Sequence, residues 1–168
     1  MKLKHLLAMS FCLLLTACAS ESGPSDVPTI MSQQETSAPM GQRYQMAENT
    51  GDPEGQYRTG MRYLLGQGTP INYSSAHHWL SQSASSNNPY AENELGYMYL
   101  AGLGVSPNQQ EAFSWYKKAA VHGLASAQYN LGLMYQNGIG TPADKAQAKS
   151  WFAKAAAQGF GPAHHKNA

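Results

Sequence analysis

The sequence predicts an all-α fold in which antiparallel helix pairs stack as a solenoid, and three observations support this prediction. Residues 53–160 contain one unit of 36 residues three times, without insertion or deletion. Glycines and helix-capping residues recur at fixed places and divide each copy into two helical segments. Seven columns are identical in all copies: Gly60, Gly96 and Gly132; Tyr63, Tyr99 and Tyr135; Gly66, Gly102 and Gly138; Gly68, Gly104 and Gly140; Ala76, Ala112 and Ala148; Trp79, Trp115 and Trp151; Ala84, Ala120 and Ala156. Such a period is typical of stacked helical repeats, which present extended surfaces to partners and seldom hold catalytic groups.

Residues 1–17 resemble a secretory signal peptide. Residues 1–4 are positively charged, and the apolar stretch over residues 6–15 is about ten residues long, against the roughly 20 that cross a bilayer. The stretch ends in Leu15-Thr16-Ala17-Cys18, which resembles the bacterial lipobox, whose cysteine is acylated and becomes the mature N-terminus. This resemblance implies lipid attachment at Cys18. An ordinary signal peptide with a stray cysteine is the alternative.

The cysteine count favours the lipid-bearing form. Cys12 and Cys18 are the two cysteines, and Cys12 lies inside the stretch that processing removes. The mature chain then keeps one thiol and cannot form an internal disulfide. In bacterial lipoproteins an Asp after the acylated cysteine favours inner-membrane retention, whereas Ala19 and Ser20 follow here. The resemblance therefore implies a lipid-anchored protein of the bacterial cell envelope, on the outer membrane and facing the periplasm.

The composition is that of a weakly charged globular chain. Charged residues make up 12% of the sequence, against about 25% in typical proteins. Of the 11 Lys and Arg residues, Lys2 and Lys4 belong to the signal segment, so nine remain against ten Asp and Glu, a net charge of −1. This balance provides no basic face for a phosphate backbone and argues against nucleic-acid binding.

The segments on either side of the three copies have different compositions. Residues 18–37 are rich in Ser, Pro, Thr, Gln and Glu and have no apolar periodicity, which predicts a disordered tether behind the lipid. Residues 38–50 and 162–168 carry traces of the repeat pattern, and we expect them to be partial helices that cap the array. The solenoid domain is therefore predicted over residues 38–168, with repeats at 53–88, 89–124 and 125–160.

Each repeat is predicted to hold two helices, here called helix A and helix B. In the third copy, Ala127, Leu131 and Tyr135 recur at helical spacing, which predicts a helix A from Ala125 to Asn137 that Gly138 ends. Helix B begins after a column of N-cap residues: Asn72, Asn108 and Asp144. Gly123 and Gly159 are expected to end their B helices, and Asn87 to replace them in the first copy.

The glycine inside helix A needs a compensation, because Gly destabilises a helix interior by about 1 kcal/mol relative to Ala. We expect helix B to approach closely at Gly132 and its equivalents, with the indole of Trp151 and its equivalents filling the space. The tryptophans are accordingly predicted to be buried core anchors rather than ligand platforms.

The unit resembles the Sel1-like repeat (SLR), a relative of the tetratricopeptide repeat. The motif residues of its first half are Ala127, the run from Leu131 to Tyr135, Gly138 and Gly140. Those of its second half are Ala112, Trp115, Tyr116, the run from Lys118 to Ala120, and Gly123. The resemblance covers three full repeats and implies a right-handed α-solenoid that works through protein contacts.

No catalytic, metal or cofactor site is predicted. His77-His78 and His164-His165 are adjacent pairs, and neighbours on a helix point about 100° apart, so neither is a natural ligand pair. The sequence has no Gly-x-Ser-x-Gly motif, and its Gly66-Gln67-Gly68 follows a helix, the opposite order to a phosphate-binding loop.

The remaining candidate site is the concave face of the array, on the side of helix A opposite the packing columns. In related tetratricopeptide arrays these columns face a ligand groove, and here they vary between copies and are unusually aromatic and apolar. Packing of these residues on neighbouring A helices is an equally weighted alternative. The candidate partner-binding residues are Tyr57, Met61, Leu64, Asn93, Tyr97, Leu100, Tyr129, Leu133 and Gln136.

The sequence therefore predicts a lipid-anchored envelope scaffold, not an enzyme, that binds a protein or peptide through this face. Two alternatives remain: an accessory protein or enzyme acting on cell-wall material, and a purely structural envelope protein. The acidic residues Glu92, Glu94 and Asp144, which an enzyme would need to bring together, lie in different repeats or at helix ends.

Overall fold

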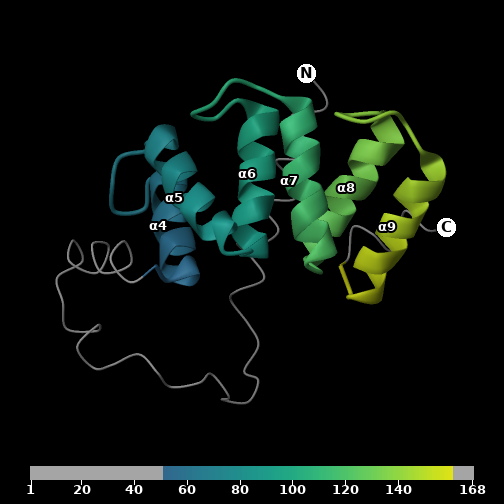
Figure 1. Ribbon diagram of the computed structural model, residues 1–168, viewed down its shortest axis with the longest axis horizontal. Helices are drawn as coiled ribbons and strands as arrows, with labels where there is room; N and C mark the ends of the chain where they lie inside the picture. Colours follow the sequence, from purple (N-terminus) through teal and green to yellow (C-terminus); the bar gives the residue numbers. More distant parts are fainter. Residues whose placement is uncertain (1–50, 161–168) are drawn as a thin grey trace, which may run out of the picture. The chain divides into compact units, whose positions relative to one another are not determined.

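The computed structural model describes residues 51–160, and all regular structure in this range is helical. The helices are α4 (Pro53–Leu65), α5 (Tyr73–Ser85), α6 (Pro89–Ala101), α7 (Gln109–Val121), α8 (Ala125–Asn137) and α9 (Lys145–Ala157). They pack as the pairs α4–α5, α6–α7 and α8–α9, and α5 with α6 and α7 with α8 join successive pairs (Figure 1). The predicted all-α array of repeated helix pairs is confirmed. The calls on residues 1–50, including Cys18, and on residues 162–168 fall outside the described range.

Local sequence signals set the helix ends as expected. The A helices α4, α6 and α8 end at Gly66, Gly102 and Gly138, whose φ angles of 70°, 72° and 67° are left-handed. The B helices α5, α7 and α9 begin at Asn72, Asn108 and Asp144, whose side chains accept hydrogen bonds from first-turn N–H groups. After α5, Asn87 has the left-handed φ of 61° that Gly123 and Gly159 supply after α7 and α9.

The glycine inside each A helix does admit a helix B side chain, but that side chain is not the tryptophan. A Cβ on Gly60, Gly96 or Gly132 would lie 2.7, 2.9 or 2.6 Å from the nearest side-chain atom of Leu80, Tyr116 or Phe152. The prediction that the indoles fill this space was wrong by one residue. Adjacent helix positions differ by about 100° in direction, so the residue after each tryptophan points into the pair. Tyr116 is only 1% exposed.

Two of the tryptophans lie instead against hydrophobic clusters that include residues of two repeats. Trp115 is partly buried against a cluster that includes Leu64 and Ala76 of the first repeat, and Trp151 against one that includes Ala119 of the second. The Lys118 and Lys154 ammonium groups each lie 3.8 Å from the centroid of the tryptophan ring three residues earlier. These two indoles therefore lie against clusters shared between repeats, are only partly buried and carry a cation–π contact, so neither is the fully buried anchor expected.

The second glycine of the loop in the second and third repeats is explained by contact between repeats. A Cβ on Gly104 would lie 2.6 Å from the backbone carbonyl carbon of Tyr73, and one on Gly140 would overlap the backbone oxygen of Gln109. The loops of the second and third repeats thus rest directly on the first turn of the B helix of the repeat before them. Only a residue without a side chain permits this approach.

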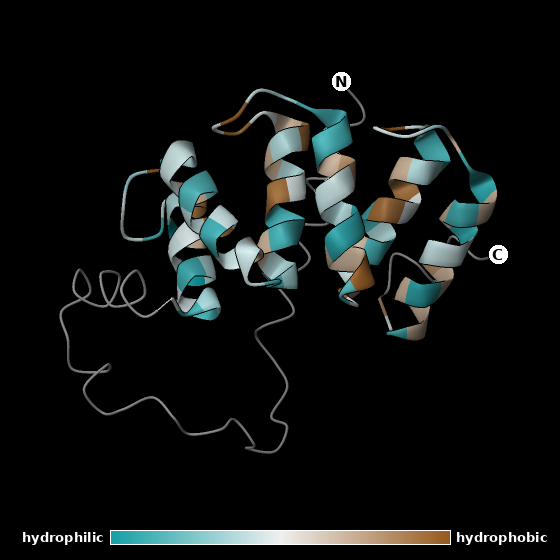
Figure 2. Cartoon of the chain, in the orientation of Figure 1, coloured by the Kyte–Doolittle hydropathy of each residue, from teal (hydrophilic) through white to brown (hydrophobic). Residues whose placement is uncertain are grey.

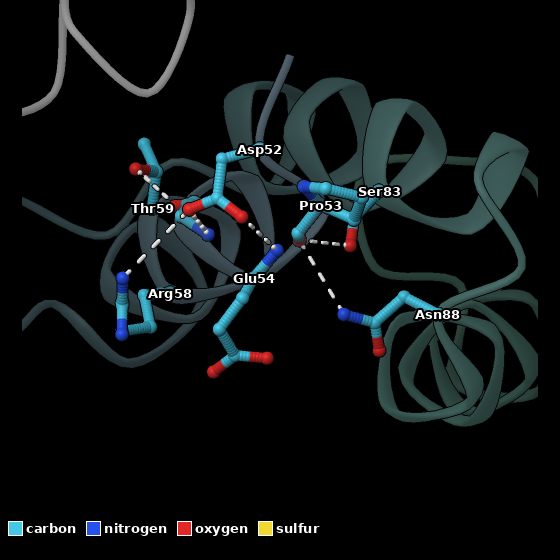
Figure 3. Close-up of polar contacts among 8 residues, drawn as sticks. Asp52, Pro53, Glu54, Arg58, Thr59, Ser83 and Asn88 are labelled. Atoms are coloured by element: carbon cyan, nitrogen blue, oxygen red, sulfur yellow. Dashed lines mark hydrogen bonds and ion pairs between the residues drawn. The ribbon is translucent and has the colours of Figure 1, made fainter. Parts of the chain in front are cut away.

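Polar contacts tie the start of α4 to the rest of the first repeat (Figure 3). The Asp52 carboxylate caps α4 by accepting from the N–H groups of Glu54 and Gly55. The Pro53 carbonyl accepts hydrogen bonds from the Ser83 hydroxyl of α5 and, at 3.4 Å, from the Asn88 amide. Since Asn88 also caps α6, this carbonyl links the first helix pair to the beginning of the second.

Every helix carries both hydrophilic and hydrophobic residues, as helices with one buried face do (Figure 2). The helix α8 departs most from this, with nine consecutive buried residues from Ser126 to Met134, and the central helix α6 follows with six, from Ala91 to Gly96. Three of these six, Glu92, Asn93 and Glu94, are polar. Burying polar groups destabilises a fold unless they are hydrogen-bonded, so these residues identify the region to consider for function.

Candidate functional site

The nine residues predicted for partner binding differ in exposure. Tyr57, Met61, Tyr97 and Leu100 are partly exposed, and Gln136 is exposed. The other four are buried, with exposed fractions of 5% for Leu64, 7% for Asn93, 8% for Tyr129 and 5% for Leu133. The expectation that these columns form one open surface therefore holds only in part, and their binding role stays a prediction.

The four buried residues pack against their neighbours, which is the alternative that the sequence left open. Leu64 belongs to the core cluster of the first two repeats. The Tyr129 ring lies between Phe152 and Phe160, at centroid distances of 5.4 and 5.6 Å. The sequence could not distinguish the two roles, because an A helix of a stacked array has neighbours on more than one side.

Part of the exposed surface of α6 is a narrow stripe along one face of the helix. Tyr90, Glu94, Tyr97 and Ala101 are spaced four, three and four residues apart, so they share one face of the helix. Tyr90 is 52% exposed, and Tyr97 and Ala101 are partly exposed. Glu94 lies in the middle of this stripe but is only 5% exposed. We call this set the α6 stripe.

Tyr90 and Glu94 were not among the predicted site residues. One signal in the sequence pointed to Glu94: its column holds Arg58 in the first repeat and Asn130 in the third, so its charge changes from copy to copy. Tyr90 follows Pro89 at the start of α6, where nothing in the sequence marks it as exposed. Its ring lies 5.8 Å from that of Tyr57 on α4, which brings the two A helices together at the stripe.

A directional chain of hydrogen bonds ends at Glu94. The Asn130 amide of α8 donates to the Asn93 oxygen of α6 at 3.3 Å, and the Asn93 amide donates to Glu94 Oε1 at 3.1 Å. An ionised carboxylate only accepts hydrogen bonds, so Glu94 fixes the orientation of both amides. Glu94 Oε2 and Asn130 Oδ1 are buried and have no hydrogen-bond partner among the described residues.

Burial sets the electrostatics of this region. It raises the pKa of Glu94 from 4.5 to about 7, against the opposing effect of the hydrogen bond from Asn93. Burial also raises the pKa values of Tyr57, Tyr97 and Tyr116, and the Glu94 carboxylate raises each of them further. Glu94 is therefore close to three phenols, and no cation of the described residues contributes to its pKa.

The other buried acid of α6 is in a different situation. Glu92 is 1% exposed, and its Oε2 lies 2.7 Å from Nδ1 of His122 at the end of α7. In the third repeat the corresponding residues are Gln128 and Gln158, joined by a 2.9 Å hydrogen bond. Glu92 is thus a partnered residue that joins the two helices of one repeat, and it differs from Glu94 in having a histidine ring nitrogen as its partner.

The described residues offer no arrangement for metal binding or for membrane crossing. No three His, Cys, Asp or Glu side chains in residues 51–160 are grouped so that they hold a metal ion. His77 packs edge-on against Tyr99 at 5.6 Å, and its pKa is lowered by burial and by His78. None of the helices over this range is sufficiently long and apolar to span a bilayer.

The repeat geometry matches a known family. The family model described as the Sel1 repeat matches residues 53–88, 89–123 and 125–160. The chain belongs to the Sel1 repeat family. The resemblance inferred from the sequence motifs is thereby confirmed, and membership of this family indicates a scaffold for protein–protein interaction.

Solved structures of Sel1 repeat proteins share this fold. A Sel1 repeat protein of Oxalobacter formigenes is 40% identical, with a TM-score of 0.69 over 75% of this chain and 95% of that one. The protective antigen c5321 of uropathogenic Escherichia coli, which displays an SLR fold, is 35% identical, with a TM-score of 0.72 over 75% of this chain and 27% of that one.

A more distant structure supports the fold alone. Cysteine rich protein B of Helicobacter pylori is 22% identical, with a TM-score of 0.61 over 76% of this chain and 97% of that one. No curated protein is significantly similar to the chain in sequence.

Proposed function

We propose that this Sel1 repeat protein is a lipid-anchored scaffold of the bacterial cell envelope that binds a protein or peptide partner through its A helices. The observation that carries the binding proposal is the α6 stripe. It places the exposed Tyr90 and the partly exposed Tyr97 on the central A helix of the array. Aromatic side chains near the middle of an interface often contribute much of its affinity.

The wider contact surface combines the stripe with the predicted columns that are open. Met61 on α4 and Leu100 on α6 are partly exposed, and Gln136 on α8 is exposed. The columns that hold the repeats together are identical in all three copies, whereas these positions differ. Surface residues that differ between copies, on a scaffold whose packing residues are the same, are suited to the recognition of one specific partner.

The proposed anchor is the lipid on Cys18, and its support comes from the sequence. The motif Leu15-Thr16-Ala17-Cys18 follows a short apolar stretch, and Cys18 is the one cysteine after it. Ala19 and Ser20 favour delivery to the outer membrane. A Cys18→Ser variant is expected to lose incorporation of labelled fatty acid and to leave the membrane fraction or remain unprocessed. Unchanged lipid labelling and fractionation would remove the anchor from the proposal.

Binding through the A helices is tested by a paired comparison. A Tyr90→Ala/Tyr97→Ala variant is expected to lose co-purification of the partner from cross-linked cells. Val121→Ala is the matched control, since Val121 on α7 is 66% exposed and apolar but lies on a B helix. Circular dichroism and thermal unfolding of both variants establish that the array remains folded. Retained partner capture by the folded double variant would place the binding surface elsewhere, for example on the B helices around Lys117 and Lys118.

A further inference from the structure

Glu94 has a buried charge with no partner among the described residues. Its Oε2 atom accepts no hydrogen bond, and its Oε1 atom accepts one, from the neutral amide of Asn93. Three of the basic side chains contact other groups: Arg58 lies 3.9 Å from Asp52, Lys118 lies over Trp115, and Lys154 lies over the Trp151 ring. A buried anion that lacks both a cation and a full set of donors destabilises the free protein.

The repeat does not require an acid at this position. Asn130 fills the same column in α8 and makes the hydrogen bond that continues the chain toward Glu94. Arg58 fills it in α4, where it is exposed. The carboxylate is therefore a feature of the central repeat alone, and packing of the repeat does not account for it.

Tyrosines of two A helices lie near the carboxylate. Tyr90 and Tyr97 flank it on α6, and Tyr57 approaches from α4, with its ring 5.8 Å from that of Tyr90. The faces of tyrosine rings attract cations, and the guanidinium group both stacks on such rings and donates up to five hydrogen bonds. The two unpartnered oxygens, Glu94 Oε2 and Asn130 Oδ1, are both acceptors, so they complement a ligand that only donates.

We propose that Glu94 and the tyrosines around it form the binding site for a basic side chain, arginine in preference to lysine, presented by the peptide or protein partner. This inference rests on the proposed function, because it assigns a chemical class to the partner of the α6 stripe. The cation supplies the charge and the donors that Glu94 lacks. Since Glu94 Oε2 is buried, the basic side chain of the partner reaches it as one of the surrounding tyrosines changes its orientation. Tyr90 is the most exposed of these tyrosines.

The affinity should depend on pH in a direction that the burial of Glu94 sets. The cation pairs with the ionised carboxylate, whose pKa is raised to about 7. The ionised fraction falls from about nine-tenths at pH 8 to about 3% at pH 5.5, so the apparent affinity should fall roughly 30-fold between them. His122 contacts the other buried acid of α6, Glu92, and not Glu94.

The test is a titration of the full-length chain with blocked pentapeptides of the form Gly-Gly-X-Gly-Gly, followed by NMR of the backbone amides. With X as arginine, saturable shifts are expected around Tyr57, Glu94 and Tyr97, with a dissociation constant on the order of millimolar, and lysine should bind more weakly. Citrulline and norleucine, which lack the charge, should give no saturable shift. Equal shifts with norleucine, or none with arginine at about ten times that concentration, would overturn the proposal.

Two variants make the test specific to this carboxylate. Glu94→Gln keeps the shape of the side chain and should weaken arginine binding at least tenfold, an effect expected when a charged hydrogen bond is lost. Glu92→Gln removes the other buried acid of α6 and should leave binding within about twofold, since Gln128 shows that the column accepts an amide. Circular dichroism checks that both variants fold. If Glu94→Gln binds arginine as the unmodified chain does, the site is wrong.

Partner capture separates this inference from the proposed function. If Glu94→Gln retains the partner and Tyr90→Ala/Tyr97→Ala loses it, the stripe binds a partner but does not recognise a basic side chain through Glu94. If the arginine peptide binds through Glu94 while the double tyrosine variant retains the partner, the cation site stands and the proposed binding surface fails. Loss of the partner in both variants is the outcome expected.

Discussion

Replacing Glu94 by Gln should make the chain more stable at high pH. The pKa of Glu94 is raised from 4.5 to about 7 on folding, so between these values the folded chain holds a proton that the unfolded chain has released. The free energy of unfolding therefore decreases as the pH rises from 4.5 through 7. A shift of this size corresponds to about 3 kcal/mol, at about 1.4 kcal/mol for each pH unit.

Glutamine has nearly the shape of protonated glutamic acid but does not ionise. The variant should match the unmodified chain below about pH 4 and exceed it by about 3 kcal/mol at pH 8 and above. Urea unfolding at a series of pH values, followed by circular dichroism, measures this difference. Glu92→Gln is the control. Its free energy of unfolding should still decrease as the pH rises, because Glu94 is unchanged. Subtracting the curves removes the titration of other groups such as His77 and His122. A difference that stays flat between pH 5 and pH 8 would refute the claim that Glu94 is buried without a cation.

Three further changes test the packing of the repeats, each by urea unfolding at pH 7. Tyr116→Ala should destabilise the chain by about 3–5 kcal/mol and Trp115→Ala by less, because Tyr116 is fully buried against Gly96 and Trp115 is only partly buried. The opposite order would contradict the assignment of Tyr116 as the core residue. Gly104→Ala should lower the free energy of unfolding by more than about 1 kcal/mol, since Gly104 has a φ of 71° and the added Cβ would lie 2.6 Å from the Tyr73 backbone. An unchanged midpoint of urea unfolding would show that the two repeats are not in this contact. His122→Ala should cost about 1–3 kcal/mol by leaving the buried Glu92 without its partner, and Glu92→Gln in the same chain should recover most of that loss.

The architecture could be predicted from the sequence because the signals that begin and end its helices are local and recur in all three repeats. Gly66, Gly102 and Gly138 end helices through their own backbone conformation, and Asn72 caps α5 with its own side chain. Neither signal depends on distant parts of the chain. The 36-residue spacing then fixes the order of the helix pairs without any knowledge of how they stack.

Two features could not be predicted because they depend on how neighbouring helices are oriented. Trp115 and Tyr116 are adjacent, both are large, and only the rotation of α7 against α6 decides that Tyr116 faces Gly96. The exposure of the A helices is a similar case, since Tyr129 and Tyr97 have similar patterns in the sequence but differ in what covers them.

The chain of hydrogen bonds through Asn130, Asn93 and Glu94 also could not be predicted from the sequence. Its members come from two helices, α6 and α8, and Asn130 lies 37 residues after Asn93. This separation is one residue more than the repeat length. A search for repeated columns at 36 residues does not find such a pair.

The central claim is that the partner contacts the A helices, and site-specific photo-cross-linking in intact cells tests it most directly. A photoreactive amino acid is placed at Tyr90 in one chain and at Val121 in another, because these apolar positions are 52% and 66% exposed and lie on an A helix and a B helix. The account predicts a discrete adduct of one size from position 90 that position 121 does not give. An adduct from position 121 alone would contradict it and move the binding surface to the B helices.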